Sequence, residues 1–404
     1  MTAPPRLAPP AQSSDPVITW NRFLLDLQAT TGAQPATVHP TYELAIMHAA
    51  IHDAIVAIDR SDAPYLVRVH AARSASPAAA ADAAARDTLV RLYPNQAASV
   101  EVQYTAALAR LPRGRRTSLG IRVGGRVAAE LLAARGGDRS GAASPPFVPG
   151  DEPGDYQLTP PAFAPPVFTH WAGVRPFVLD RASQFRPPPP PAVTSPKYAA
   201  AINEVKALGA AQGSVRTADQ TQIGLFWNPP IWAAWNHIAE TAALARRGDM
   251  DENARTFAAL DLTFADSVIA FYDAKYRYGF WRPVTAIRGA DADGNPDTVA
   301  DPAWTPLSAT APDPSYPGAH GTISAAGADV LAAIYGNDVA FSATSSALPG
   351  VERSFVSFSE AAEEASESRI FNGNHTRLDE VAGENLGRDV AGFVLRHEGL
   401  GDGR

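Results

Sequence analysis

Apolar residues recur at intervals of three and four along most of this chain, which is the spacing that repeats one face of an α-helix. The longest such segments are rich in Ala and Leu and cover residues 42–58, 97–111, 117–134 and 254–278. The alternation of apolar and polar positions that marks a half-buried strand is not evident. The pattern therefore predicts an all-α fold.

Residues 136–195 break this helical pattern. They include five consecutive prolines, Pro187 to Pro191, and proline removes a helix hydrogen bond and fixes φ. The segment HWAGVRPFVL, residues 170–179, is too apolar for a solvated linker. Because long ordered loops are uncommon and often functional, we predict a Pro-rich wrap that packs over the helices near the entrance of a site.

Composition narrows the classes of function. The chain has 404 residues, a formal net charge of -8 and no cysteine. Clustered Lys and Arg for nucleic acid are not evident, and disulfides, zinc–thiolate sites and a cysteine nucleophile are excluded. No apolar run approaches the length of a membrane span, and residues 1–14 are predicted to be a flexible N-terminal tail without a signal-peptide core. We expect a soluble protein, and the lack of a signal peptide favours a cytoplasmic location.

The first of three motifs is KYRYGFWRP, residues 275–283. Lys275 and Arg282 are seven residues apart, close to two helical turns, so both can project from one face of a helix. Pro283 should end that helix near Arg282. Taken alone, the motif is also consistent with a solvated basic face.

The second motif, PSYPGAHG, lies where a proline-rich segment becomes a helix. A helix N-terminus presents unpaired N–H groups and a partial positive charge, which favour a bound anion. The small residues Gly318, Ala319 and Gly321 would let an oxyanion approach that backbone. His320 would then stand beside the anion as a proton donor or acceptor. The alternative is a helix-capping turn in which the histidine only packs.

The third motif is SRIFNGNHTRLDE, which holds Arg369 and His375 six residues apart. On a continuous helix these two residues would lie on different faces. The NGN sequence predicts a helix stop, with Gly373 in a left-handed cap, and Thr376 followed by Asp379 predicts the start of the next helix. Such a break can turn Arg369 and His375 toward one point, although alone it is equally a structural feature.

Together the motifs supply three cations, two histidines and a helix N-terminus, which suit a tetrahedral oxyanion. Arginine can match two oxygens at once, whereas lysine supplies a point charge. One histidine can attack or ligate the central atom while the other moves protons.

Lys-x6-Arg-Pro, a small-residue loop that ends in His, and Arg-x5-His occur in that order. This order resembles the signature of the vanadium-dependent haloperoxidase and type 2 phosphatidic acid phosphatase superfamily. The segments WNRFLLDLQ, MHAAIHDAI, VRPFVLDRASQFRPPPPP, INEVKALG and ADADGNPDT resemble its bacterial haloperoxidase-like branch, so the likeness covers roughly residues 15 to 395. It implies two four-helix bundles in one domain, residues 15–404, with the oxyanion site within residues 270–380.

By this resemblance, His375 would bind vanadium axially, or attack phosphorus in a phosphatase. His320 would be the acid–base residue, and Lys275 would polarise bound peroxide. Vanadate is the implied cofactor, and phosphate would fit the same site. The residues that would hold the oxyanion are Lys275, Arg282, Gly318, Ala319, Arg369 and His375.

Three positions depart from the family pattern. Gly318 replaces the usual loop serine, and the loss of one hydrogen bond to a charged group costs about 1.5–3 kcal/mol. Asp313 stands where the family has an aromatic residue or a histidine near the halide, and an inward carboxylate would repel halide. Tyr272 replaces a frequent tryptophan. Trp281 and His237 are further candidates to line the substrate pocket.

Three functions follow as hypotheses, all with a small-molecule substrate, and the number of chains, including a homodimer, is left open. The first is a vanadate-dependent peroxidase that uses hydrogen peroxide to oxidise halide or another small nucleophile, such as a sulfide. The second is a metal-free acid phosphatase with His375 as nucleophile and His320 as general acid. The third is a redox-neutral acid–base enzyme, or an anion-binding module, that has lost vanadate.

Overall fold

The computed structural model describes residues 13–397, so residues 1–12 of the predicted N-terminal tail lie outside the described part. Its first helices are α1 (Pro16–Ala29), α2 (Pro40–Asp59), α3 (Pro77–Leu92), η1 (Pro94–Gln96), α4 (Ala97–Leu108), α5 (Arg115–Arg135) and η2 (Trp171–Gly173). They are followed by α6 (Pro196–Leu208), α7 (Ala218–Phe226), α8 (Ile231–Arg246), α9 (Met250–Tyr278), α10 (Pro283–Arg288) and η3 (Ala290–Ala292). The last are α11 (Ala319–Tyr335), α12 (Phe358–Phe371) and α13 (Arg377–His397).

The four segments with helical periodicity all form helices, as α2, α4, α5 and α9, and the predicted all-α fold class is confirmed. Several helices begin where a side chain caps the first turn. The side chains of Ser76, Ser195 and Asp249 accept backbone N–H groups at the starts of α3, α6 and α9, which satisfies donors that a helix leaves free. None of the helices in residues 13–397 is long and apolar enough to cross a membrane.

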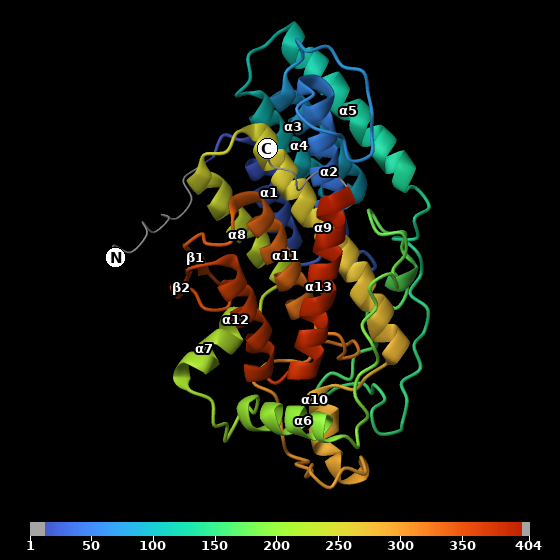
Figure 1. Cartoon of the computed structure of the whole chain (residues 1–404). Coiled ribbons are helices and arrows are strands. Elements are labelled where there is room, and N and C mark those ends of the chain that lie inside the picture. The colour runs from blue at the N-terminus through green and yellow to red at the C-terminus, as the bar shows by residue number, and fades with distance from the viewer. Residues whose placement is uncertain (1–12, 398–404) are drawn as a thin grey trace, which may run out of the picture.

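The helices form two groups that share the long helix α9. Helices α2, α3 and α5 pack together with α1 and α4, whereas α11, α12 and α13 pack together with α7 and α8. Figure 1 shows most of the first group in blue and cyan at the top, and below it α11, α12 and α13 in orange and red with α7 and α8 in yellow-green. Helix α9 packs against α2 from the first group and against α11 and α13 from the second, so it ties the two groups together.

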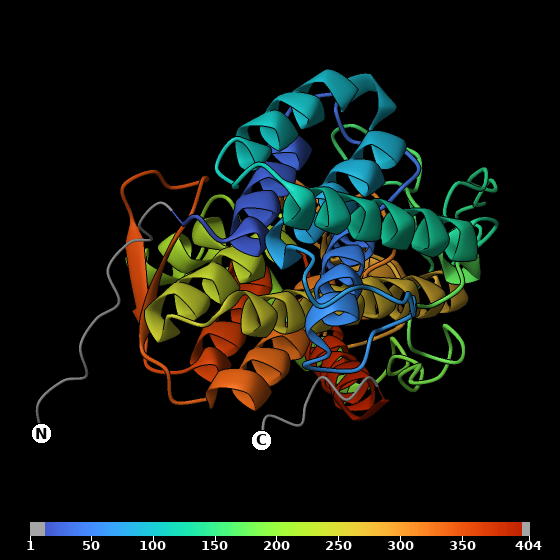
Figure 2. The ribbon, with the colours of Figure 1, turned by 90° about the horizontal axis from the view of Figure 1, so that it is seen from above.

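One feature was missed by the expectation of an all-helical chain. Strands β1 (Phe341–Thr344) and β2 (Glu352–Phe355) form an antiparallel hairpin in which Phe341 pairs with Phe355. Figure 2 shows this hairpin at the edge of the molecule, outside the helices. Each strand has only four residues and buries one of them, which is too short a pattern to establish alternation.

The Pro-rich segment, residues 136–195, is ordered and wraps over the helices as predicted. The buried carboxylate of Asp266 on α9 accepts the backbone N–H groups of residues 177–179 at 2.6–2.8 Å. Farther along the wrap, Arg186 forms an ion pair with Asp273, also on α9. The same helix that carries Lys275 therefore holds the wrap in place.

Helices α11 and α13 come close together because glycines face the contact. A Cβ atom on Gly387 would lie well inside 3.0 Å of the Thr322 carbonyl oxygen, and one on Gly383 well inside 3.0 Å of the Gly318 carbonyl oxygen. Glycine is suited to such close approach because it has no side chain. This packing sets the start of α13 against the N-terminus of α11.

The substitution Gly387→Ala is expected to destabilise the protein by about 1–3 kcal/mol, because the added methyl group forces α11 and α13 apart. The control is Gly392→Ala on the same helix, where the nearest atom is the movable Arg396 guanidinium at 3.2 Å. There alanine should stabilise the helix by up to about 1 kcal/mol. Urea unfolding of both variants measures the difference, and equal stabilities would contradict the close contact.

Candidate active site

The first motif is arranged differently from the prediction of one helix face. Helix α9 ends at Tyr278, and Gly279, with a φ of 55°, caps it by donating its N–H to the Lys275 carbonyl. Arg282 is the residue before α10. A turn, and not a continuous helix to Arg282, therefore brings the two cations together, because the left-handed glycine stops α9 one turn early. Both side chains are buried.

The third motif contains the predicted helix break. Gly373 has a φ of 83° between α12 and α13, and the backbone N–H of His375 donates to the Arg369 carbonyl at 3.2 Å. The next helix starts with the predicted cap, since the N–H of Thr376 donates to Asp379 Oδ2 at 2.7 Å and the N–H of Asp379 donates to Thr376 Oγ1 at 3.3 Å. The break folds His375 back beside Arg369.

The second motif forms the N-terminus of α11, with Gly318 as the N-cap. The Gly318 N–H donates at 2.7 Å to a backbone carbonyl at the start of α13, so this N–H is already engaged, while the expectation that Gly318 lines the oxyanion site stays a prediction. The N–H groups of Ala319 and His320 have no protein acceptor within residues 13–397. These two donors are the ones open to an anion.

Asp313 points into the site and pairs with both cations of the first motif. Its Oδ2 lies 3.2 Å from Lys275 Nζ, and its Oδ1 accepts from Arg282 Nη2. The backbone carbonyl of Asp313 accepts from Arg282 Nε at 2.7 Å. Burial alone would raise the pKa of Asp313, but Lys275 and Arg282 outweigh it and hold the pKa below its ordinary value.

Lys275 donates to three acceptors from one segment of the chain. Besides Asp313, it donates to the carbonyl of Pro314 and, at 3.2 Å, to the carbonyl of Ser315. Burial lowers the pKa of Lys275 to about 8, although Asp313 opposes the shift. An ammonium group has three protons, so the loop that precedes α11 engages all of them.

The tautomer of His375 follows from its partners. Its Nε2 lies 2.9 Å from Arg282 Nη1, and because a guanidinium can only donate, Nε2 carries a lone pair. The proton is then on Nδ1, 3.3 Å from Ser315 Oγ and 3.6 Å from Asp379 Oδ2. Burial, followed by the cation Arg282, lowers the pKa of His375 well below its ordinary value. The neutral ring therefore presents Nε2 as a ligating or attacking atom.

His320 has the opposite tautomer. Its Nε2 lies 3.0 Å from the backbone carbonyl oxygen of Trp227, which can only accept, so Nε2 is protonated and Nδ1 carries the lone pair. Burial, followed by the charge of Arg369, lowers the pKa of His320 well below its ordinary value. His320 is therefore neutral and can accept a proton at Nδ1.

Arg369 differs from the other two cations because it has no carboxylate within 4.0 Å among residues 13–397. Its side chain is buried, its Nε lacks a hydrogen-bond partner, and its Nη1 reaches only Asn228 Oδ1 at 3.5 Å. Burial lowers the pKa of Arg369 to about 10. Burying a guanidinium without a counter-charge costs free energy, so a bound anion would stabilise this group.

The donor set fits a tetrahedral oxyanion. Arg369 Nε and the N–H groups of Ala319 and His320 are open to it. The lone pair of His375 Nε2 would have to exchange its contact with Arg282 Nη1 for the anion, and Lys275 and Arg282 would have to be shared with Asp313. Residues 13–397 contain no group of three or more His, Asp or Glu side chains suited to a bare metal ion.

Comparisons with known proteins identify relatives of this chain among vanadium-dependent enzymes. The model of the VCPO second helical-bundle domain matches residues 255–399, which contain all three motifs. Vanadium chloroperoxidase of Curvularia inaequalis is 30% identical over 161 residues, which make up 32% of this chain and 26% of that protein. The chain thus spans about a quarter of the length of the curated relative that it matches.

Solved structures extend the likeness over the whole fold. A bacterial vanadium-dependent iodoperoxidase superposes with a TM-score of 0.82 at 25% identity, covering 97% of this chain and 98% of that one. A holo-type bacterial vanadium-dependent chloroperoxidase superposes with a TM-score of 0.69 at 16% identity, covering 96% and 97%. The predicted resemblance to the vanadium haloperoxidases is confirmed.

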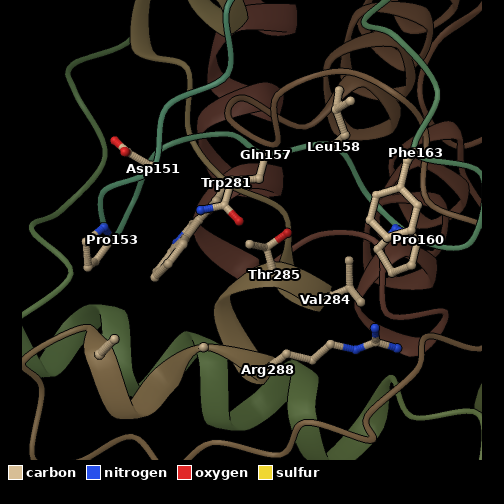
Figure 3. Close-up of a pocket in the computed structure, with 12 residues that line it drawn as sticks. Asp151, Pro153, Gln157, Leu158, Pro160, Phe163, Trp281, Val284, Thr285 and Arg288 are labelled. Carbon is tan, nitrogen blue, oxygen red and sulfur yellow. The ribbon is translucent and has the colours of Figure 1, made fainter.

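The other residues predicted to line the substrate pocket differ in how deeply they are buried. Tyr272 is buried, with its ring 5.5 Å from that of Phe168 in the wrap. Trp281 lines a pocket of about 390 Å³ between the Pro-rich wrap and α10, and Figure 3 shows it there beside Pro153. The side chain of His237 is 61% exposed, so its predicted place in a pocket was wrong, because it lies on the outer face of α8.

Three functional neighbours were missed, although two motifs contain them. Ser315 and Asp379 contact His375 Nδ1, and Glu380 accepts the N–H of Gly321 at 2.7 Å. Burial raises the pKa of Glu380 to about 8, with Arg369 opposing the shift. The signal that could have identified these three residues is that each is polar and lies inside a motif. Their contacts could not be predicted, because they depend on how the helices pack.

We expect Asp313→Asn to destabilise the protein in anion-free buffer by about 3–5 kcal/mol, because it leaves buried cations without a partner. Added phosphate should restore part of that loss by taking the place of the carboxylate. Melting temperatures with and without phosphate measure both effects. The control is Asp389→Asn on the exposed face of α13, and an equally small response in both variants would contradict the internal ion pairs.

Proposed function

We propose that the chain is a vanadate-dependent peroxidase that uses hydrogen peroxide to oxidise a small nucleophile. The observation that carries the proposal is the pair of opposite histidine tautomers beside the cations. Nε2 of His375 is unprotonated and would ligate once its contact with Arg282 Nη1 is given up, and Nε2–H of His320 is held by Trp227, which leaves Nδ1 as the proton acceptor. Vanadate, when bound, supplies a Lewis-acidic centre that activates peroxide.

The residues that would hold vanadate are those of the three motifs. His375 would ligate through Nε2, held in that tautomer by Nδ1–H facing Ser315 and Asp379. Arg369 would donate through its free Nε, and the N–H groups of Ala319 and His320 would add the α11 N-terminus. Lys275 and Arg282 would contribute charge while remaining in contact with Asp313.

His320 is suited to be the base that takes a proton from hydrogen peroxide. The carbonyl of Trp227 fixes its Nε2–H, and the low pKa keeps Nδ1 unprotonated at neutral pH. Cleavage of a phosphate ester would instead begin with a proton donor for the leaving group. The neutral His320 therefore supports the peroxidase over the phosphatase.

Asp313 bears on the choice of nucleophile. The Asp313 carboxylate contacts Lys275 and Arg282, the same cations that would attract a halide. A halide beside these cations would therefore lie close to the carboxylate, and two negative charges repel strongly inside a protein. The pairing leaves less positive charge for a free anion. We therefore infer that an uncharged nucleophile, such as an organic sulfide, is preferred to halide.

The phosphatase is the second candidate, since one observation favours it. Nε2 of His375 is an unprotonated nucleophile, and Asp379, near Nδ1, would stabilise the positive ring that attack on phosphorus creates. The two candidates differ in what they require. The peroxidase requires vanadate and peroxide, whereas the phosphatase requires neither.

The purified protein, with vanadate and hydrogen peroxide, is expected to convert an organic sulfide to its sulfoxide. His375→Ala should lower this rate by at least about a hundredfold, in the range that loss of a key catalytic group costs, because the one imidazole ligand is gone. His237→Ala is the control and should retain the wild-type rate, since His237 lies on the surface. Chromatography of the sulfoxide measures the rates.

Parallel hydrolysis of p-nitrophenyl phosphate without vanadate separates the alternatives. Phosphate ester cleavage that is lost in His375→Ala, without sulfoxidation, would favour the phosphatase. Inactivity in both assays would contradict both candidates and leave the redox-neutral enzyme.

Asp313→Asn is expected to raise bromide oxidation relative to sulfide oxidation by about tenfold, which corresponds to about 1.4 kcal/mol. Without the carboxylate charge, the positive charges of Lys275 and Arg282 are no longer neutralised and attract a halide more strongly. Bromination of a diketone reporter and sulfoxidation are measured on the same preparation. A ratio that does not change would mean that Asp313 has no influence on the choice of nucleophile.

A further inference from the structure

The two residues that follow α7 contact two groups of the candidate active site. The backbone carbonyl of Trp227, the C-cap of α7, accepts from His320 Nε2 at 3.0 Å. The next residue places Asn228 Oδ1 3.5 Å from Arg369 Nη1. A backbone carbonyl moves only with its chain, so the position at which α7 ends determines how the ring of His320 is held.

The side chain of Trp227 fixes the residue that carries this carbonyl. It is buried, and its Nε1–H donates to Glu364 Oε1 on α12 at 2.9 Å. Its ring centre lies 5.9 Å from that of Phe355 on β2. An indole has one donor, and a buried donor without a partner costs free energy. Packing and one hydrogen bond therefore hold Trp227 in place.

Arg353 of β2 joins the hairpin to the same contacts. Its Nε and Nη2 each donate to one carboxylate oxygen of Glu364 at 2.7 Å, which is the bidentate pairing that arginine favours. Its Nη1 donates to Asp219 and Gln222 on α7 at 2.8 Å. The side chains of Arg353 and Glu364 are only 14% and 16% exposed, so solvent screens this pair less than an exposed one.

The hairpin contacts the end of α7 at a further point. Ser345, just after β1, donates its hydroxyl to the carbonyl of Phe226 at 2.6 Å, one residue before Trp227. Figure 1 shows the hairpin above α7 and beside α12. By contrast, the exposed hydroxyl groups of Ser342 and Ser354 pair with each other across the hairpin. One set of hairpin side chains thus serves the hairpin itself, and the other holds the end of α7.

We propose that the β1–β2 hairpin positions the candidate base, with Arg353 and Glu364 as positioning residues that hold the Trp227 carbonyl against His320. The proposal rests on the proposed function, because it takes His320 as the group that receives the proton. A displaced carbonyl would release Nε2–H and let the ring turn, which moves Nδ1 as well. Within residues 13–397, neither Arg353 nor Glu364 hydrogen-bonds to a group that would hold vanadate, so both act through Trp227.

Exchange of the His320 Nε2 proton with water tests the hydrogen bond without relying on enzyme activity. It is followed by NMR of protein labelled with 15N-histidine, and His320→Gln identifies the signal among nine histidines. We expect slow exchange in the wild-type protein. Glu364→Ala should exchange about tenfold faster or more, because exchange follows local opening. Arg353→Gln should change exchange in the same direction by a smaller factor, since Glu364 still accepts from the indole.

Two variants serve as matched comparisons. Glu364→Gln keeps an oxygen that can accept the Trp227 Nε1–H, so its exchange should stay within a few-fold of wild type. Ser354→Ala, next to Arg353 on β2, removes a hydrogen bond that stays within the hairpin. This variant should exchange as the wild-type protein does.

Sulfoxidation kinetics separate positioning from a general loss of structure. Glu364→Ala should lower kcat/KM for hydrogen peroxide by about tenfold or more, because a small misplacement of a catalytic group is costly in rate. The KM for the sulfide should change by less than about twofold, since the base acts on peroxide and not on the sulfide. Glu364→Gln should recover most of the rate, and Ser354→Ala should retain it.

Several results would overturn this inference. They are fast exchange in the wild-type protein, slow exchange in Glu364→Ala, an equal effect in Ser354→Ala, or faster exchange with an unchanged kcat/KM for peroxide. If Glu364→Ala does not fold, Arg353→Gln decides, and exchange and rate equal to wild type would also overturn it. A wild-type protein with slow exchange but no sulfoxidation would instead refute the proposed function, and the exchange rates of the variants would still decide whether the hairpin holds His320.

Discussion

The burial of three cations in one place is the constraint on which the rest of this site depends. Lys275, Arg282 and Arg369 are all removed from solvent, and unpaired charges in a protein interior are costly. Asp313 offsets two of these charges by direct contact. Arg369 is left without such a partner, and this asymmetry leaves an uncompensated positive charge at one side of the site and a closed ion-pair cluster at the other.

Much of this arrangement could be predicted from the sequence, because its causes are local. Gly373 between two asparagines predicts a left-handed helix stop, and the structure has one. The prolines and small residues before His320 predict the helix start of α11. The error at Arg282 also has a local cause, since Gly279 ends α9 before Pro283 has any influence.

The contacts that decide the chemistry could not be predicted in this way, because they join residues distant in the chain. Asp313 meets Lys275 across 38 positions, and Glu380 meets Gly321 across 59. The first contact depends on how the loop before α11 lies against α9, and the second on how closely α11 and α13 pack. Hydrophobic periodicity specifies neither. The exposure of His237 is a similar case, since its aromatic neighbours suggested a core position that the packing of α8 does not provide.

The departures of this chain from the family pattern are connected by packing and charge. A serine at 318 and the carboxyl of Glu380 cannot occupy the same space, so the loss of one and the position of the other are a single structural change. Asp313 likewise alters the charge that a halide would meet without removing either cation. The cations and backbone donors that would hold an oxyanion are therefore kept, while Asp313 changes the charge around them, and this change is the reason for proposing an uncharged nucleophile.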